Sequence, residues 1–176
     1  HMNYLTHQLL NAEEINFIKK ELEQENQGWE DGKKTAGTHA SKVKNNLQLK
    51  RTSDISKKLS SLVKQKILND DLIKSFTLPK KIHGIMFTKS SKGMKYGRHI
   101  DNAYMSSGRA DLSFTIFLTK KSLYKGGELL IENLSSEKKF KLKEGEILIY
   151  PSTIYTQLMK FSMEKEPYVL DGSKVI

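Results

Sequence analysis

Apolar residues recur at helical spacing in the first half of the chain. Ile15, Ile18 and Leu22 form one apolar stripe after Asn11, which we expect to cap a helix with an acidic first turn. A second helix is predicted to begin after Ser53. Its apolar face would consist of Ile55, Leu59, Leu62, Val63 and Ile67.

The second half of the chain has the alternation and turn residues of short strands. A polar, glycine-bearing loop over residues 29–49, ending in a short strand, interrupts the helical half. Eight further strands are expected, over residues 82–87, 96–101, 112–118, 128–132, 138–142, 146–150, 155–161 and 168–170. This order predicts an α+β fold in which the strands form a sandwich or a double-stranded β-helix (jelly roll), with supporting N-terminal helices.

Length and composition are those of one globular domain. The chain has 176 residues, of which 37% are hydrophobic. His1 and Met2 resemble a cloning remnant, so we place one domain at 3–176, with the jelly-roll core at 82–170. No apolar run has the length of a membrane span, and there is no cysteine. We therefore expect a cytoplasmic protein with no membrane partner and no disulfide.

The net charge of +10 does not by itself identify a partner. Nearly all the cations are lysines, and the arginines are Arg51, Arg98 and Arg109. Lysine is a solvated point charge, whereas arginine is better suited to bidentate contacts with phosphates and bases. We interpret the scattered lysines as a solvated surface and expect no nucleic-acid partner, although a basic jelly roll that binds nucleic acid is a third hypothesis.

His99 and Asp101 are the residues most suggestive of chemistry. Positions i and i+2 of a strand point to the same side, so both side chains can reach one metal ion. An imidazole and a carboxylate suit Fe(II), and a second histidine from another strand would complete a facial triad. We expect the other histidines, His7, His39 and His83, to be structural or at the surface.

Several linked motifs resemble a known family. The stretches WEDGKKTAGTHASKVKNNLQL, GMKYGRHIDNAYM, RADLSFTIFL, YKGGELLI and KLKEGEILIYPST are similar, in order and spacing, to those of the PKHD-type hydroxylases. These enzymes belong to the Fe(II)/2-oxoglutarate dioxygenase superfamily and are related to prolyl 4-hydroxylase. The resemblance runs from about Tyr4 to the end of the chain.

The resemblance implies an enzyme that hydroxylates a protein or peptide side chain and converts 2-oxoglutarate to succinate. Fe(II) and 2-oxoglutarate would be its cofactors, with ascorbate a candidate reductant. A homodimer is one candidate for its oligomeric state. His99 and Asp101 would bind the metal, with no catalytic residue beyond the metal ligands. Tyr96 corresponds to a tyrosine that can reach 2-oxoglutarate, and Thr115 would either hydrogen-bond it or line the barrel.

The chain departs from the family at two positions. Counted from the YPS segment, the distal histidine is replaced by Thr156, and the basic residue that clamps 2-oxoglutarate is replaced by Glu166. A shift of one residue would place Tyr155 at the ligand position and Lys165 at the clamp. We favour the unshifted alignment. These departures raise the alternative of a catalytically impaired family member that acts as a binding or regulatory module.

Overall fold

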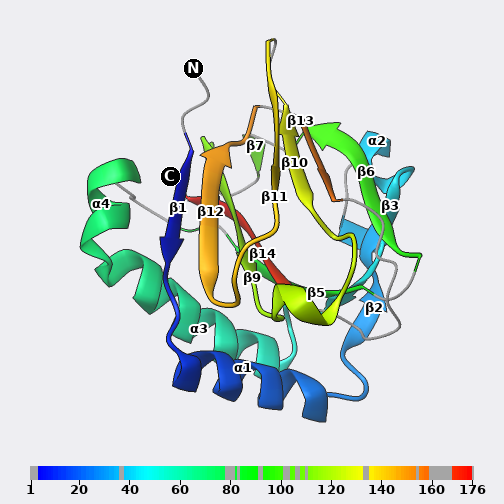
Figure 1. Ribbon diagram of the computed structural model, residues 1–176. Coiled ribbons are helices and arrows are strands. Elements are labelled where there is room, and N and C mark those ends of the chain that lie inside the picture. Colours follow the sequence, from blue (N-terminus) through cyan, green and yellow to red (C-terminus); the bar gives the residue numbers. More distant parts are fainter. Residues whose placement is uncertain are drawn as a thin grey trace.

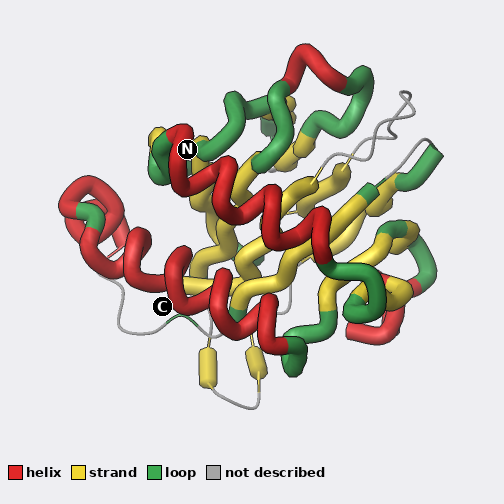
Figure 2. The backbone as a smooth tube through the Cα atoms, turned by 90° about the horizontal axis from the view of Figure 1, so that it is seen from below, coloured by secondary structure: helices red, strands yellow, loops and turns green. Residues whose placement is uncertain are grey.

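Two long helices lie side by side across one face of a large sheet (Figure 1; Figure 2). Helix α1 (Ala12–Gln24) begins with a complete capping box, because Asn11 and Glu14 each bond the backbone N–H of the other. Helix α3 (Asp54–Asn69) is capped by the Ser53 hydroxyl. The Asn11 cap, the start of the second helix after Ser53 and both apolar stripes were predicted from the sequence and are confirmed.

The computed structural model describes most of the chain, namely residues 4–35, 38–77, 82, 84–90, 93–100, 104–105, 108–109, 111–132, 135–153, 155–158 and 168–175. Two short helices complete the helical part, α2 (Thr38–Ser41) and α4 (Asp71–Thr77). Single 3₁₀ turns cover Gly32–Thr35 and Lys121–Leu123. Among the described residues, no helix is long and apolar enough to cross a membrane.

The strands form two antiparallel sheets and a small hairpin. The seven-stranded sheet has the order β1 (Leu5–Gln8), β12 (Glu146–Pro151), β9 (Leu112–Phe117), β14 (Tyr168–Val175), β5 (Ile85–Lys89), β4 (Leu47–Leu49) and β2 (Trp29–Asp31). The five-stranded sheet has the order β11 (Glu137–Phe140), β10 (Leu129–Glu132), β13 (Tyr155–Leu158), β6 (Lys95–Ile100) and β3 (Lys44–Asn45). Strands β7 (Tyr104–Met105) and β8 (Gly108–Arg109) pair with each other.

Alternating side chains of the seven-stranded sheet serve two different cores. On β9, Phe114 and Ile116 pack into the cluster that includes Ile18 and Leu59 of the helices. Phe117 faces the other way, into a cluster with residues of the second sheet, such as Ile131. The sheets therefore enclose an interior between them, while the helices seal the outer face of the larger sheet.

All eight strands predicted for the second half are present, with shifted ends. The fold class, an α+β jelly roll, is confirmed. The sequence did not reveal β1, which pairs with β12, or α4. The expected loop over residues 29–49 contains β2, α2 and β3 as well as the short strand β4. The closing strand extends to Val175 and pairs with β5 and β9, well inside the sheet.

The pairing of β6 with β13 contains one irregularity. His99 pairs with Thr156 and Tyr96 pairs with Leu158, so three residue steps on β6 match two on β13. One extra residue on β6 is the signature of a β-bulge. Gly97 lies within it, and its N–H donates to the carbonyl of Val43 at 2.9 Å.

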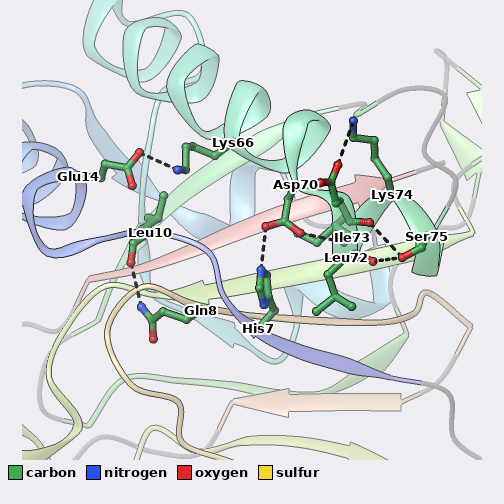
Figure 3. A network of polar contacts seen from close by, with 11 residues as sticks. His7, Gln8, Leu10, Glu14, Lys66, Asp70, Leu72, Ile73, Lys74 and Ser75 are labelled. Carbon is green, nitrogen blue, oxygen red and sulfur yellow. Dashed lines mark hydrogen bonds and ion pairs between the residues drawn. The ribbon is translucent and has the colours of Figure 1, made fainter.

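The first strand is tied to the junction of α3 and α4 by a polar contact (Figure 3). His7 Nε2 lies 2.7 Å from Asp70 Oδ2, while Oδ1 of Asp70 accepts the N–H of Ile73 at 2.9 Å and caps α4. Burial alone would raise the pKa of Asp70, but the hydrogen bonds from Ile73 and His7 outweigh it and lower that pKa below its ordinary value.

We predict that Asp70→Ala lowers the free energy of unfolding by about 1–2 kcal/mol at neutral pH, because the cap and the His7 contact are both lost. A lowered folded-state pKa contributes stability above the unfolded value, and this contribution disappears as the pH falls through the folded value. The difference from wild type in urea denaturation should therefore shrink under acidic conditions. Asp71→Ala, at an exposed neighbouring carboxylate, is the control; an equal loss there would contradict the assignment.

We predict that Gly97→Ala destabilises the chain by about 1–3 kcal/mol through overpacking. A Cβ at this position would lie 2.8 Å from Cβ of Val43, closer than two carbons can approach. Gly84→Ala is the matched control, since the nearest atom to its added Cβ lies at 3.4 Å. Thermal unfolding of both variants measures the difference, and equal melting temperatures would show that the bulge does not depend on glycine.

Candidate metal and cosubstrate site

His99 belongs to a row of cross-strand partners that crosses the five-stranded sheet. Its partner on β13 is Thr156, and the partner of Thr156 on β10 is Ile131. Ile131 is part of the core between the sheets, so Thr156 shares that inner face, and it is 2% exposed. Asp101 lies outside the described residues. The structure thus brings the predicted third-ligand position next to His99 through the backbone pairing alone.

Tyr155 lies on the outer face of the same sheet. The guanidinium of Arg98 stacks over its ring, with Cζ 3.5 Å from the ring centroid. Arg98 Nε also donates to Glu132 at 2.6 Å, and this bond raises the pKa of Arg98. Since neighbouring residues of a strand face opposite sides, the shifted alignment would need Tyr155 to leave these contacts. Lys165 and Glu166, the two clamp candidates, lie outside the described residues.

Tyr96 and Thr115 lie on different sheets. The bulge gives Tyr96 the backbone partner Leu158, two residues from Thr156. Thr115 is 2% exposed and lies on the inner face of β9, in the opposite sheet. Its partner on β14 is Asp171, an acidic residue that the sequence analysis did not consider.

The interior has an apolar part and a polar part. The apolar part is the cluster that includes Phe117, Leu129 and Phe140. The polar part comprises buried side chains of both sheets and of the turn before β13: Gln48, Thr88, Ser113, Thr115, Ser152 and Thr156. This part of the interior is therefore lined by hydroxyl and amide groups rather than by apolar side chains.

The YPS segment anchors the turn that leads into β13. The Ser152 hydroxyl lies 2.9 Å from that of Ser113, and the Ser152 N–H donates to the carbonyl of Asp111 at 2.9 Å. Both serines are almost fully buried. The segment therefore fixes where β13 starts and, with it, which residue becomes the partner of His99.

Asn46 is a polar residue that the sequence analysis missed. It connects β3 of the smaller sheet to β4 of the larger one and is 3% exposed. Within the described part of the chain, neither Oδ1 nor Nδ2 of its amide has a hydrogen-bond partner. A buried unsatisfied group costs about 1–3 kcal/mol, so this amide is poised to pair with a ligand. The polar NN pair in the sequence was its only signal.

The other histidines lie away from the His99 row. His7 contacts Asp70 on the helical side, and His39 is exposed on α2. His83 lies outside the described residues. Among the described side chains, no group of three or more His, Cys, Asp or Glu residues is placed to hold a metal ion.

The predicted donor set would suit a divalent cation, but with fewer strong ligands than a facial triad. His99 and Asp101 would supply one imidazole and one carboxylate. At the third position, the buried Thr156 would offer a hydroxyl, which is neutral and weakly coordinating. We therefore expect binding through two strong protein ligands, with lower affinity than three would give.

Comparison with known proteins identifies the family of the chain. A sequence model described as the 2OG-Fe(II) oxygenase superfamily matches residues 85–164, which include β6 and β13. A PKHD-type hydroxylase of Prochlorococcus marinus strain MIT 9215 is 69% identical over 165 residues, covering 93% of this chain and 75% of the relative. Another, from strain AS9601, is 61% identical over 175 residues, covering 99% of this chain and 76% of the relative.

Solved structures share the fold at low sequence identity. A Pseudomonas putida prolyl-4-hydroxylase superposes with a TM-score of 0.70 at 14% identity, covering 99% of this chain and 92% of that one. A prolyl hydroxylase from Trichoplax adhaerens, in complex with a hypoxia inducible factor peptide fragment, gives 0.68 at 15% identity, covering 97% and 83%. The sequence identity to the Prochlorococcus proteins establishes the family: this chain belongs to the PKHD-type hydroxylases of the 2OG-Fe(II) oxygenase superfamily.

Proposed function

We propose that this chain hydroxylates a side chain of a protein or peptide in a reaction that depends on Fe(II) and 2-oxoglutarate. The observation that carries the proposal is the row that joins His99 to the buried Thr156 on the inner face of the jelly roll. The proposal is further supported by the buried polar side chains around Thr156 and by the membership of this chain in a family of oxygenases.

Different residues of the chain would bind the metal and 2-oxoglutarate. His99 and Asp101 hold the metal, and Tyr96 and Thr115 orient 2-oxoglutarate, with Lys165 a candidate for its distal carboxylate. When bound, iron and 2-oxoglutarate supply the oxidising chemistry, in which 2-oxoglutarate is decarboxylated to succinate. The apolar cluster around Phe117 and Leu129 keeps water out of the interior. Ascorbate is the proposed reductant, and the cytoplasm the proposed location.

A peptide substrate is supported by two observations. The buried Asn46 amide offers one donor and one acceptor, the pair that a peptide backbone requires. The structural neighbour from Trichoplax adhaerens is in complex with a peptide fragment. We propose a peptide segment that enters beside the crossover from β3 to β4.

A second candidate function is a binding module that keeps the fold without turnover. Thr156 as the partner of His99 favours it, because a neutral hydroxyl replaces a strong ligand.

We predict that His99→Ala weakens Mn(II) binding by about tenfold or more, because one of two strong ligands is lost. Calorimetric titration of wild type and variant measures this, with His39→Ala, at an exposed histidine, as the control. Succinate release from 2-oxoglutarate with Fe(II) should be abolished by His99→Ala and retained by His39→Ala. Equal Mn(II) affinity in all three proteins would contradict the assigned metal position.

The same measurements separate the two functions. Binding of Mn(II) that depends on His99, together with succinate release, supports the hydroxylase. Such binding without succinate release, over a range of peptide substrates, supports the binding module instead.

A further inference from the structure

A basic hollow lies on the helix-covered face of the seven-stranded sheet, away from the His99 row. Its volume is about 290 Å³, at the lower end of the range for small-ligand sites. Three cations and three hydroxyls line it: Arg51, Lys57, Lys64, Ser56, Ser60 and Ser61. No acidic side chain is among its lining residues.

The hollow is built where α3 passes over the ends of two paired strands. Arg51 follows β4, and Gly84 and Ile85 lie at the start of β5, the neighbour of β4. Ser56, Ser60 and Lys64 are spaced four residues apart on α3 and so lie along one side of the helix. Secondary structure therefore fixes the spacing of these groups.

The guanidinium of Arg51 lies close to the backbone of Gly84. A Cβ there would lie 3.4 Å from Cζ of Arg51 and 3.5 Å from one terminal nitrogen. Arg51 is exposed as a whole residue, yet desolvation of its head group lowers its pKa. A partly desolvated cation is stabilised by an anion more strongly than a fully hydrated one.

The two lysines leave their charge available to a ligand. Within the described part of the chain, neither Lys57 nor Lys64 forms an ion pair. By contrast, Lys58 and Lys66 of the same helix pair with Glu21 and Glu14 of α1. The lysines of α3 that form ion pairs therefore lie on the side that faces α1, and the two without ion pairs line the hollow.

The chemistry of the lining favours a phosphate group over a simple carboxylate. Three positive charges suit a multiply charged anion, and the planar fork of arginine matches two phosphate oxygens. Ser56, which is 1% exposed, and the two other serines can donate to the remaining oxygens. We propose that this hollow binds a small anion that carries a phosphate or diphosphate group.

Calorimetric titration with pyrophosphate tests the proposal on the full chain. We expect Arg51→Gln and Lys64→Gln each to weaken binding by about tenfold, the effect of losing one charge-assisted contact. Lys20→Gln removes the same charge from an exposed site on α1 and should bind as wild type does. Circular dichroism of each variant confirms that the fold is retained.

Two further titrations, with citrate and with an oligonucleotide, test whether charge alone is enough for binding and whether the phosphate belongs to a small molecule or to a polymer. Citrate, a carboxylate anion of high charge, should bind at least about tenfold more weakly than pyrophosphate if arginine geometry matters. A single-stranded oligonucleotide tests for a polymeric ligand. The proposal would be overturned if pyrophosphate did not bind, or if only the oligonucleotide bound. It would also be overturned if citrate bound as tightly as pyrophosphate, or if Lys20→Gln weakened binding as much as the other variants.

Discussion

The antiparallel pairing of β6 with β13 is the constraint on which the candidate site depends. It makes Thr156 the partner of His99, and the further pairing with Ile131 ties this row to the interior between the sheets. Because side chains alternate along a strand, moving β13 by one residue would exchange the inner and outer faces throughout. Arg98, stacked on Tyr155 from the outer face, opposes such a slip.

The rest of the fold holds this pairing in place. The Ser152 contacts fix the start of β13, and the bulge at Gly97 adjusts the far end of β6. The helices seal the opposite face of the larger sheet, so that its inner face is free to carry polar groups such as Thr115 and Gln48. The same helices, by aligning some lysines with acids of α1 and leaving others beside Arg51, create a second polar region outside the interior.

Local patterns in the sequence were sufficient for most of the secondary structure. The caps at Asn11 and Ser53 and the strong alternation of β9 and β12 depend on neighbouring residues, and these elements were predicted correctly. The short strands β1 and β3 show no readable period in the sequence. Their existence depends on partners fifty or more residues away.

The candidate site was only partly predictable for the same reason. The pairing of Asp171 with Thr115 and the enclosure of Asn46 are long-range consequences of how the sheets close, and no local pattern marks them. Thr156 could be counted to from the YPS segment, whereas its contact with the His99 row required the structure.

We expect Thr156 to stand where a third metal ligand would be. Calorimetric titration of Mn(II) into Thr156→His and Tyr155→His tests it directly, because the two variants add the same imidazole to opposite faces of β13. We expect Thr156→His to bind Mn(II) about tenfold or more tightly than wild type and Tyr155→His to match wild type. Tighter binding by Tyr155→His, or no gain in Thr156→His with its fold intact, would contradict the account.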